Sequence, residues 1–124
     1  QFFGDNTTLA KESISDIDKS FIERFKKLIE DNLSNSELNV EELGRSMGMS
    51  RVQLYRTVKS LTNYAPNELL RIARLKKATS LLSSSDMTIA EITYEVGFTS
   101  PSYFTKCYKD HFGESPTDFL KRKG

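Results

Sequence analysis

The sequence predicts an all-α fold of two helix-turn-helix units joined by a long linker helix, with about seven helices in all. Three observations support this prediction. Apolar residues recur at helical spacing, one segment of roughly thirty residues occurs twice, and each copy carries residues typical of helix starts and ends. Of the 124 residues, 37% are hydrophobic and 28% are charged, a composition that favours a small helical protein without a membrane contact.

Changes in composition along the chain indicate four parts. Residues 1–15 are polar and lack periodicity, so we interpret them as a linker or an expression remnant. We expect a first helix-turn-helix subdomain over residues 16–66, a linker helix over 67–83 and a second subdomain over 84–124. The first subdomain begins with a helix from Asp16, because its apolar residues recur every three or four positions: Phe21, Phe25, Leu28, Ile29 and Leu33.

An internal repeat carries the fold prediction. Residues 40–48 match residues 89–97, with apolar side chains at the first, fourth and eighth positions and a glycine at the ninth. The second copy then has one extra residue, after which the two copies stay aligned at an offset of 50. The aligned pairs include Ser50 with Ser100, Arg56 with Lys106, Lys59 with Lys109, Asn63 with Gly113, and Pro66 with Pro116. One small structural unit is therefore expected twice.

Each copy contains its own start and stop signals. Gly48 and Gly97 can adopt the positive φ that ends a helix and turns the chain sharply. The expected helix-starting pairs are Asn39 with Glu42, Ser50 with Gln53, Thr88 with Glu91, and Ser100 followed by Pro101. Each copy therefore reads as helix, glycine turn, helix.

The copies are linked by a predicted helix over residues 67–82, and a short helix over 117–123 is expected to close the chain. The apolar face of the 67–82 helix is supplied by leucines and alanine. Its basic residues are expected to stay solvated: Arg71, Arg74, Lys76 and Lys77. A linker of about 16 residues would be roughly 24 Å long. That length would allow the two units to reach major grooves about one DNA turn, or roughly 34 Å, apart.

The second helix of a helix-turn-helix unit presents its N-terminal turn to the major groove of DNA. These recognition helices are predicted over residues 50–62 and 100–112. The residues expected to pack beneath them are Leu54, Val58 and Leu61 in the first and Phe104 and Tyr108 in the second. Residues 1–49 carry 6 basic and 10 acidic side chains, whereas residues 50–124 carry 12 and 7, an asymmetry that weakly favours a polyanion partner. We therefore predict binding to double-stranded DNA.

Residues 89–104, followed by Phe112, Gly113 and Pro116, resemble the signature segment of AraC/XylS-family transcription regulators. The resemblance extends over about residues 20 to 121 and implies a DNA-binding domain of two helix-turn-helix lobes. It places the base-reading positions at Val52, Tyr55, Arg56, Ser102, Tyr103 and Lys106. Lys106 stands where arginine is common in the family, which weakens the case for a bidentate guanine contact there. The candidates for phosphate contacts are Ser50, Arg51, Lys59, Thr99, Ser100 and Lys109.

The first helix, with Asp18, Phe21 and Ile29, resembles the version attached to hybrid two-component sensors for carbohydrate use. A one-component regulator with an N-terminal ligand-binding domain remains open. The resemblance implies the output domain of a cytoplasmic, signal- or sugar-responsive activator. Its implied partners are DNA, RNA polymerase and an N-terminal sensor or ligand-binding region absent from this chain.

The rival classes are an enzyme and a helical interaction module. An enzyme is not expected, because the single histidine (His111) and the single cysteine (Cys107) form no nucleophile–base pair with an orienting group. No cluster of residues has metal-ligand spacing, and the six scattered glycines form no phosphate-binding loop. No cofactor or metal is expected either. Cys107 is interpreted as a packing residue, and Tyr94 as packed or interfacial. The alternative is a helical module that contacts the transcription machinery without reading DNA, and the salt dependence of DNA binding separates the two.

Overall fold

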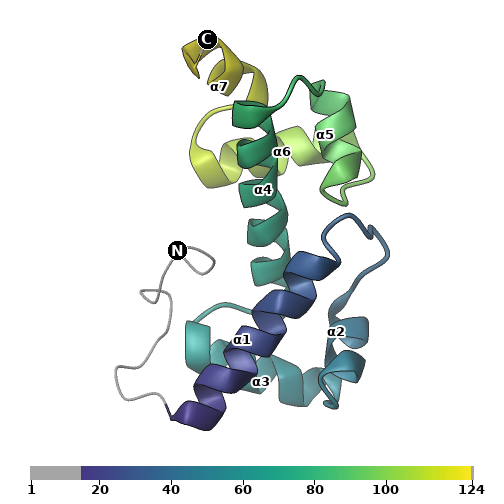
Figure 1. Ribbon diagram of the computed structural model, residues 1–124, viewed down its shortest axis with the longest axis vertical. Helices are drawn as coiled ribbons and strands as arrows, with labels where there is room; N and C mark the ends of the chain where they lie inside the picture. The colour runs from purple at the N-terminus through teal and green to yellow at the C-terminus, as the bar shows by residue number, and fades with distance from the viewer. Residues whose placement is uncertain (1–14, 124) are drawn as a thin grey trace. The chain divides into compact units, whose positions relative to one another are not determined.

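The computed structural model describes residues 15–123, which form seven α-helices and no strand (Figure 1). The helices are α1 (Asp16–Asp31), α2 (Val40–Ser46), α3 (Arg51–Thr62), α4 (Pro66–Ser84), α5 (Ile89–Glu95), α6 (Pro101–Phe112) and α7 (Pro116–Lys123). The predicted all-α fold is confirmed. The segment interpreted as a linker or remnant lies outside the described residues except for Ser15, whose hydroxyl accepts from the Asp18 N–H and caps α1.

The chain divides into two compact units. Unit 1 contains residues 15–32 and 38–71, and unit 2 contains residues 33–37 and 72–123. Helix α4 therefore contributes its first turns to unit 1 and its remainder to unit 2. The short segment 33–37, which joins α1 to α2 along the chain, belongs to unit 2.

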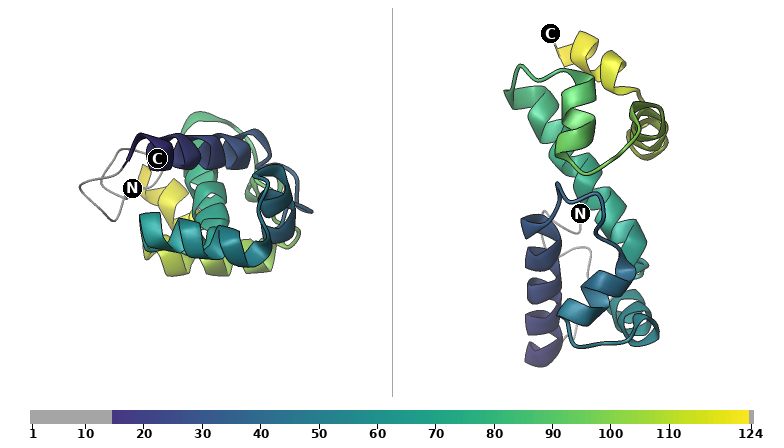
Figure 2. Two further views of the ribbon diagram at one scale, coloured as in Figure 1. Left: turned by 90° about the horizontal axis from the view of Figure 1, so that it is seen from below. Right: turned by 90° about the vertical axis from the view of Figure 1, so that its right-hand side faces the viewer.

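In unit 1, α1, α2 and α3 pack against one another and the start of α4 completes the core (Figure 2). Helix α1 buries a single stripe, in which Phe25 and Ile29 are fully enclosed and the Phe21 ring stacks on Phe25 with centroids 6.3 Å apart. Helix α2 adds the fully buried Leu43. Helix α3 buries the three residues that the sequence predicted, Leu54, Val58 and Leu61.

In unit 2, α4 supplies one side of the core and α5 and α6 supply the other. The core consists of Leu75, Ala78, Leu82, Ile92, Val96, Phe98, Phe104, Cys107 and Tyr108. Phe104 and Tyr108 are buried as predicted, and Cys107 is the expected packing residue. The Thr79 hydroxyl donates to the Tyr108 hydroxyl at 3.0 Å, and burial raises the pKa of Tyr108 above its ordinary value.

Helix starts follow the predicted capping residues. The Ser50 hydroxyl accepts from the Gln53 N–H at 3.1 Å while the Gln53 side chain accepts from the Ser50 N–H at 2.9 Å, which completes a capping box. Thr88 and Glu91 form the same reciprocal pair at the start of α5. Each box satisfies two backbone donors that a helix end would otherwise leave unpaired.

The predicted capping box at α2 is only half formed. The Asn39 side chain accepts from the Glu42 N–H at 2.9 Å. The Glu42 carboxylate, however, accepts from the Arg45 guanidinium at 2.8 Å and does not return to the cap. An arginine one turn away competes for the carboxylate, because residues three apart share a helix face.

The turns bear out the internal repeat at the level of single dihedral angles. Gly48 and Gly97 have φ of 71° and 90°, as predicted for the residues that end the first helix of each unit. The recognition helices also end alike, since the aligned residues Asn63 and Gly113 are both left-handed, with φ of 68° and 83°. Asparagine tolerates this region better than most residues, so either type serves as the stop.

Two helices begin one residue earlier than predicted, and one also ends later. Pro66 and Pro116 are the first residues of α4 and α7 rather than their predecessors, because a first-turn proline lacks an N–H that the helix would not use. Helix α4 also continues past residue 82, its predicted end. The hydroxyls of Ser84 and Ser85 donate to carbonyl oxygens four residues earlier at 2.7 Å, which keeps the last turn closed.

Candidate DNA-binding surface

Helix α3 exposes the face opposite its buried leucines and valine. Val52 and Tyr55 remain 56% and 48% exposed, although apolar or aromatic residues usually lose more surface, and Arg56 is exposed beside them. The helix carries three basic side chains and no acid. This face therefore combines an apolar contact, an aromatic hydroxyl and a guanidinium in a cationic setting.

Helix α6 exposes the equivalent face. Ser102 and Lys106 are exposed, and Tyr103 remains 55% exposed. The Tyr103 ring nevertheless lies 5.9 Å from the ring of the buried Phe98, which limits its freedom. The six base-contact candidates thus occupy matching exposed faces of α3 and α6.

The N-terminal ends of the two recognition helices are ordered by their caps. The Ser100 hydroxyl accepts from the Tyr103 N–H at 3.2 Å, as the Ser50 hydroxyl does from the Gln53 N–H in the other copy. Because Pro101 has no N–H, α6 presents one backbone donor fewer at this end than α3. The positive end of the helix dipole favours a phosphate at the N-terminus of α3 and at the N-terminus of α6.

The remaining phosphate-contact candidates also lie at the surface. Arg51, Lys59, Thr99 and Lys109 are exposed, whereas Ser100 is half-buried. The Lys59 ammonium donates to the Asn63 carbonyl oxygen at 3.0 Å, at the C-terminal end of α3. Opposite charge at a helix C-terminus stabilises it slightly, so Lys59 has a structural contact as well as an exposed charge.

One interaction on this surface was not predicted. The Lys106 ammonium lies 2.8 Å from the Asp110 carboxylate, in an exposed ion pair one turn apart on α6. The hydrogen bond and the charge of Asp110 raise the pKa of Lys106. The spacing of four residues between a lysine and an acid on a predicted helix was the signal available in the sequence.

The turn before α6 is packed more closely than the turn before α3. A Cβ added at Gly97 would lie 2.3 Å from the Leu33 carbonyl oxygen and 2.8 Å from Arg74 Nε. A Cβ added at Gly48 would meet nothing within 4 Å. In the second copy Phe98 follows the glycine and lies in the core, where its ring meets the Phe104 ring edge-on with centroids 5.3 Å apart.

The prediction that Arg74 stays solvated is wrong. Its guanidinium Nη2 donates to the Asn35 carbonyl oxygen at 2.8 Å, while its Nε is buried without a hydrogen-bond partner. Burial lowers the pKa of Arg74. Arg74 is thereby held between segment 33–37, α4 and the turn at Gly97, contacts between distant parts of the chain that helical periodicity does not reveal.

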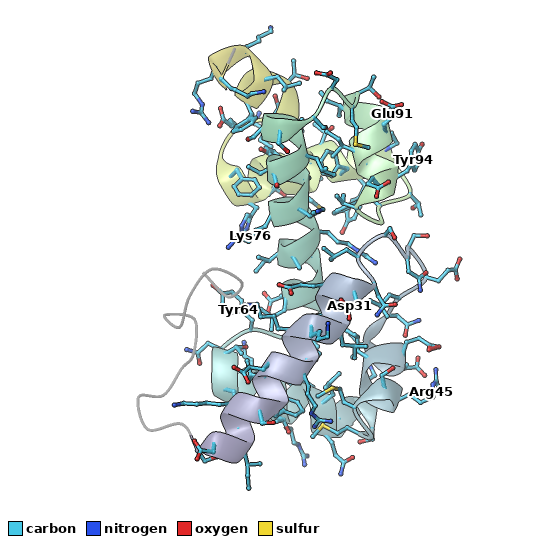
Figure 3. All side chains as sticks on the ribbon, in the orientation of Figure 1. Asp31, Arg45, Tyr64, Lys76, Glu91 and Tyr94 are labelled. Carbon is cyan, nitrogen blue, oxygen red and sulfur yellow. The ribbon has the colours of Figure 1, made fainter. Side chains whose placement is uncertain are left out.

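Tyr94 on α5 is 55% exposed and points away from the helix (Figure 3). Of the two roles expected for Tyr94, packed or interfacial, packing is not seen, because Ile92 and Thr93 take the buried positions of this short helix. An interfacial role for Tyr94 stays a prediction.

Within residues 15–123, no three histidine, cysteine or acidic side chains are arranged to hold a metal ion. In the same part of the chain, no helix is both long and apolar enough to cross a membrane.

Two units that each present a capped, exposed second helix after a glycine turn define a helix-turn-helix DNA-binding domain. The family described as helix-turn-helix domain matches residues 43–122. An AraC-type transcriptional regulator of Chromobacterium violaceum shares the fold, with a TM-score of 0.80 over 89% of this chain and 97% of that one at 24% identity. This chain belongs to the AraC-type helix-turn-helix family of DNA-binding domains.

Two further comparisons bear on function. The DNA-binding domain of AdpA, solved in complex with a target DNA, matches with a TM-score of 0.76 and 28% identity over 81% of this chain and 89% of that one. Histidine kinase P4 of Formosa agariphila is 37% identical over 115 residues, which are 93% of this chain and 8% of that protein. The chain thus spans a small fraction of the length of this curated relative. The alternative of a module that does not read DNA is not favoured by these similarities.

Proposed function

We propose that this domain reads a specific double-stranded DNA sequence by placing α3 and α6 in two successive major grooves. The observation that carries the proposal is the duplication of one surface. A capping serine precedes both α3 and α6, and the aligned pairs Val52 with Ser102 and Arg56 with Lys106 are exposed on the side opposite a buried core. Each helix also exposes one tyrosine, although Tyr55 and Tyr103 do not align. A surface that only needed to be solvated would have no reason to repeat this pattern.

The proposed base contacts follow from the chemistry of each exposed side chain. Arg56 can donate two hydrogen bonds to guanine, and Lys106 one or two without the rigid fork. Val52 offers only an apolar contact, which suits a thymine methyl group. The hydroxyls of Tyr55, Ser102 and Tyr103 can donate or accept at base edges.

The proposed phosphate contacts flank these positions. Basic side chains at both ends of α3 and near the C-terminal end of α6, together with the hydroxyls at the N-terminal ends, would position the helices without reading sequence. The contacts are assigned to Ser50, Arg51, Lys59, Thr99, Ser100 and Lys109.

The intact protein is proposed to be a signal- or sugar-responsive activator with an N-terminal sensory region. The similarity to a histidine kinase favours a hybrid two-component regulator over a one-component one. We assign no enzymatic activity to this domain itself. It would act on DNA in the cytoplasm and contact RNA polymerase through surfaces other than α3 and α6.

Selection of bound duplexes from a random pool tests the proposal. Two short conserved boxes about one helical turn, or roughly 34 Å, apart are the expected result. Affinity for the selected duplex should fall by roughly 10³–10⁵ between 50 and 200 mM salt if 6–10 phosphates are contacted. A pool without enrichment, or binding that salt leaves unchanged, would contradict sequence-specific DNA binding and restore the interaction-module alternative.

Substituting Lys59→Ala or Lys109→Ala should weaken binding equally on all duplexes and reduce the salt slope by about one. Each substitution removes a charge that attracts phosphate without reading a base. The measurement is affinity over a salt series, by fluorescence anisotropy. Lys27→Ala on α1 is the matched control, since Lys27 is an exposed lysine paired with Asp31. A slope that stays at the wild-type value would count against the assignment.

A further inference from the structure

The ion pair on α6 connects a base-contact candidate to an acid on the same face. Lys106 Nζ and Asp110 Oδ2 are 2.8 Å apart, and the two side chains are 71% and 65% exposed. Asp110 lies one turn beyond Lys106, so its charge faces the same surroundings as the lysine. On a surface that approaches DNA, a carboxylate is repelled by the phosphates that attract its partner.

The internal repeat supplies a natural comparison for this pair. Arg56 aligns with Lys106, and Ser60 aligns with Asp110. Helix α3 therefore has a base-contact candidate at the matching position but no carboxylate one turn away. Of the two recognition helices, only α6 carries an acid at this position, so the shared helix-turn-helix fold does not require it.

The packing of α6 gives Asp110 no other role. The helix is anchored through Phe104, Cys107 and Tyr108, while Asp110 is exposed and its carboxylate accepts a hydrogen bond from Lys106. An exposed pair of this kind contributes little to stability. The Asp110 charge therefore neither anchors the helix nor attracts phosphate, so we look for its role in the choice of DNA sequence.

We infer that Asp110 is a specificity-determining residue, which holds the Lys106 ammonium until the acceptor atoms of the correct base pair replace it. This inference rests on the proposed function of α6. On an unrelated sequence, Lys106 would exchange one anionic partner for another and the carboxylate would still be repelled. On the selected sequence, hydrogen-bond acceptors of a base edge replace the bond that Lys106 loses to Asp110. Asp110 therefore weakens nonspecific binding more than specific binding.

The test compares Asp110→Asn with the wild-type domain on the selected duplex and on an unrelated duplex of equal length. The substitution keeps the shape of the side chain and removes its charge. At 50 mM salt, we expect affinity for the unrelated duplex to rise roughly threefold to tenfold, and affinity for the selected duplex to rise less than about twofold. The ratio of the two affinities should therefore fall.

Asp86→Asn is the matched control, because Asp86 is an exposed aspartate between α4 and α5 and outside the reading helices. It should leave the ratio unchanged. Ser60→Asp is the reciprocal change and should raise the ratio by weakening binding to the unrelated duplex. A ratio that Asp110→Asn leaves at the wild-type value, or lowers no more than Asp86→Asn does, would overturn the inference.

A double-mutant cycle with Lys106→Gln tests whether Asp110 acts through the lysine. In the Lys106→Gln background, Asp110→Asn should no longer change the ratio. If the change persists in that background, Asp110 acts directly on the DNA and the inference is wrong. Wild-type protein that selects no duplex would instead remove the proposed function, so the two failures are distinguishable.

Discussion

Gly97→Ala should destabilise unit 2 by roughly 3 kcal/mol or more, whereas Gly48→Ala should cost unit 1 only about 1–2 kcal/mol. Both glycines have positive φ, so an added side chain strains the backbone at both positions. The two differ in what the new Cβ would meet. At Gly97 it would lie 2.3 Å from the Leu33 carbonyl oxygen, and at Gly48 it would meet nothing within 4 Å.

Clashing with a backbone atom is costly because the chain itself must move to relieve it. Here the chain that must move is segment 33–37, which Arg74 also holds through the Asn35 carbonyl oxygen. A shift of this segment would lengthen that hydrogen bond as well. The larger loss expected at Gly97 therefore reflects the close approach in addition to the strain of positive φ.

Urea unfolding followed by circular dichroism measures both variants against the wild-type domain. Gly97→Ala should lower the transition midpoint clearly more than Gly48→Ala does. Equal losses would mean that only the φ angle matters and that the close contact is relieved without cost. Gly97→Val adds a β-branch to the same clash and should be at least as destabilising.

Local signals in the sequence predicted most of the fold. Caps such as Ser50 and Thr88 and the stop at Gly48 act within one turn of their own helix, so their residue types are sufficient evidence. The repeat then extended each local interpretation to a second site. The prediction ended α4 at residue 82, and the cause of this difference is also local, since the hydroxyls of Ser84 and Ser85 bond to the backbone and close the last turn.

The features that the sequence did not reveal depend on contacts between distant residues. In the sequence Arg74 is one more basic residue that periodicity assigns to the solvated face of a helix. Only the fold brings it to Asn35 and Gly97. Phe98 directly follows the glycine of the turn, and only the fold brings its ring onto Phe104. Periodicity assigns a side chain to a face, but it does not say what lies opposite that face.

The candidate reading surface was predictable because exposure is the complement of burial on a helix. Once Leu54 and Val58 are assigned to the core, Val52 and Arg56 must lie on other faces. Charge pairs along that surface are harder to predict from sequence, because an exposed side chain can reach several partners. Lys106 has Asp110 one turn away and takes it, whereas no acid competes for Arg56 within α3.

Arg56→Ala should weaken binding to the selected duplex by roughly 1–3 kcal/mol and relax the choice of base at one position. The guanidinium on the exposed face of α3 can donate two parallel hydrogen bonds to guanine, which no other base pair accepts in the same geometry. The measurement repeats the random-duplex selection with the variant and compares its affinity for single-base variants of the site. Arg24→Ala on α1, an exposed arginine in the same unit, is the control and should leave base preference unchanged.

Arg56→Lys separates charge from geometry at this position. It keeps the positive charge, so the salt dependence of binding should stay close to that of the wild-type domain. It removes the rigid fork, so discrimination between guanine and adenine should fall nearly as far as in Arg56→Ala. Equal weakening by Arg56→Ala on every sequence, with discrimination intact, would instead identify Arg56 as a phosphate contact. Because α6 carries a lysine at the aligned position, Arg56→Lys also gives the first copy the side-chain chemistry of the second, and the two boxes should then be read with similar, weaker base preference.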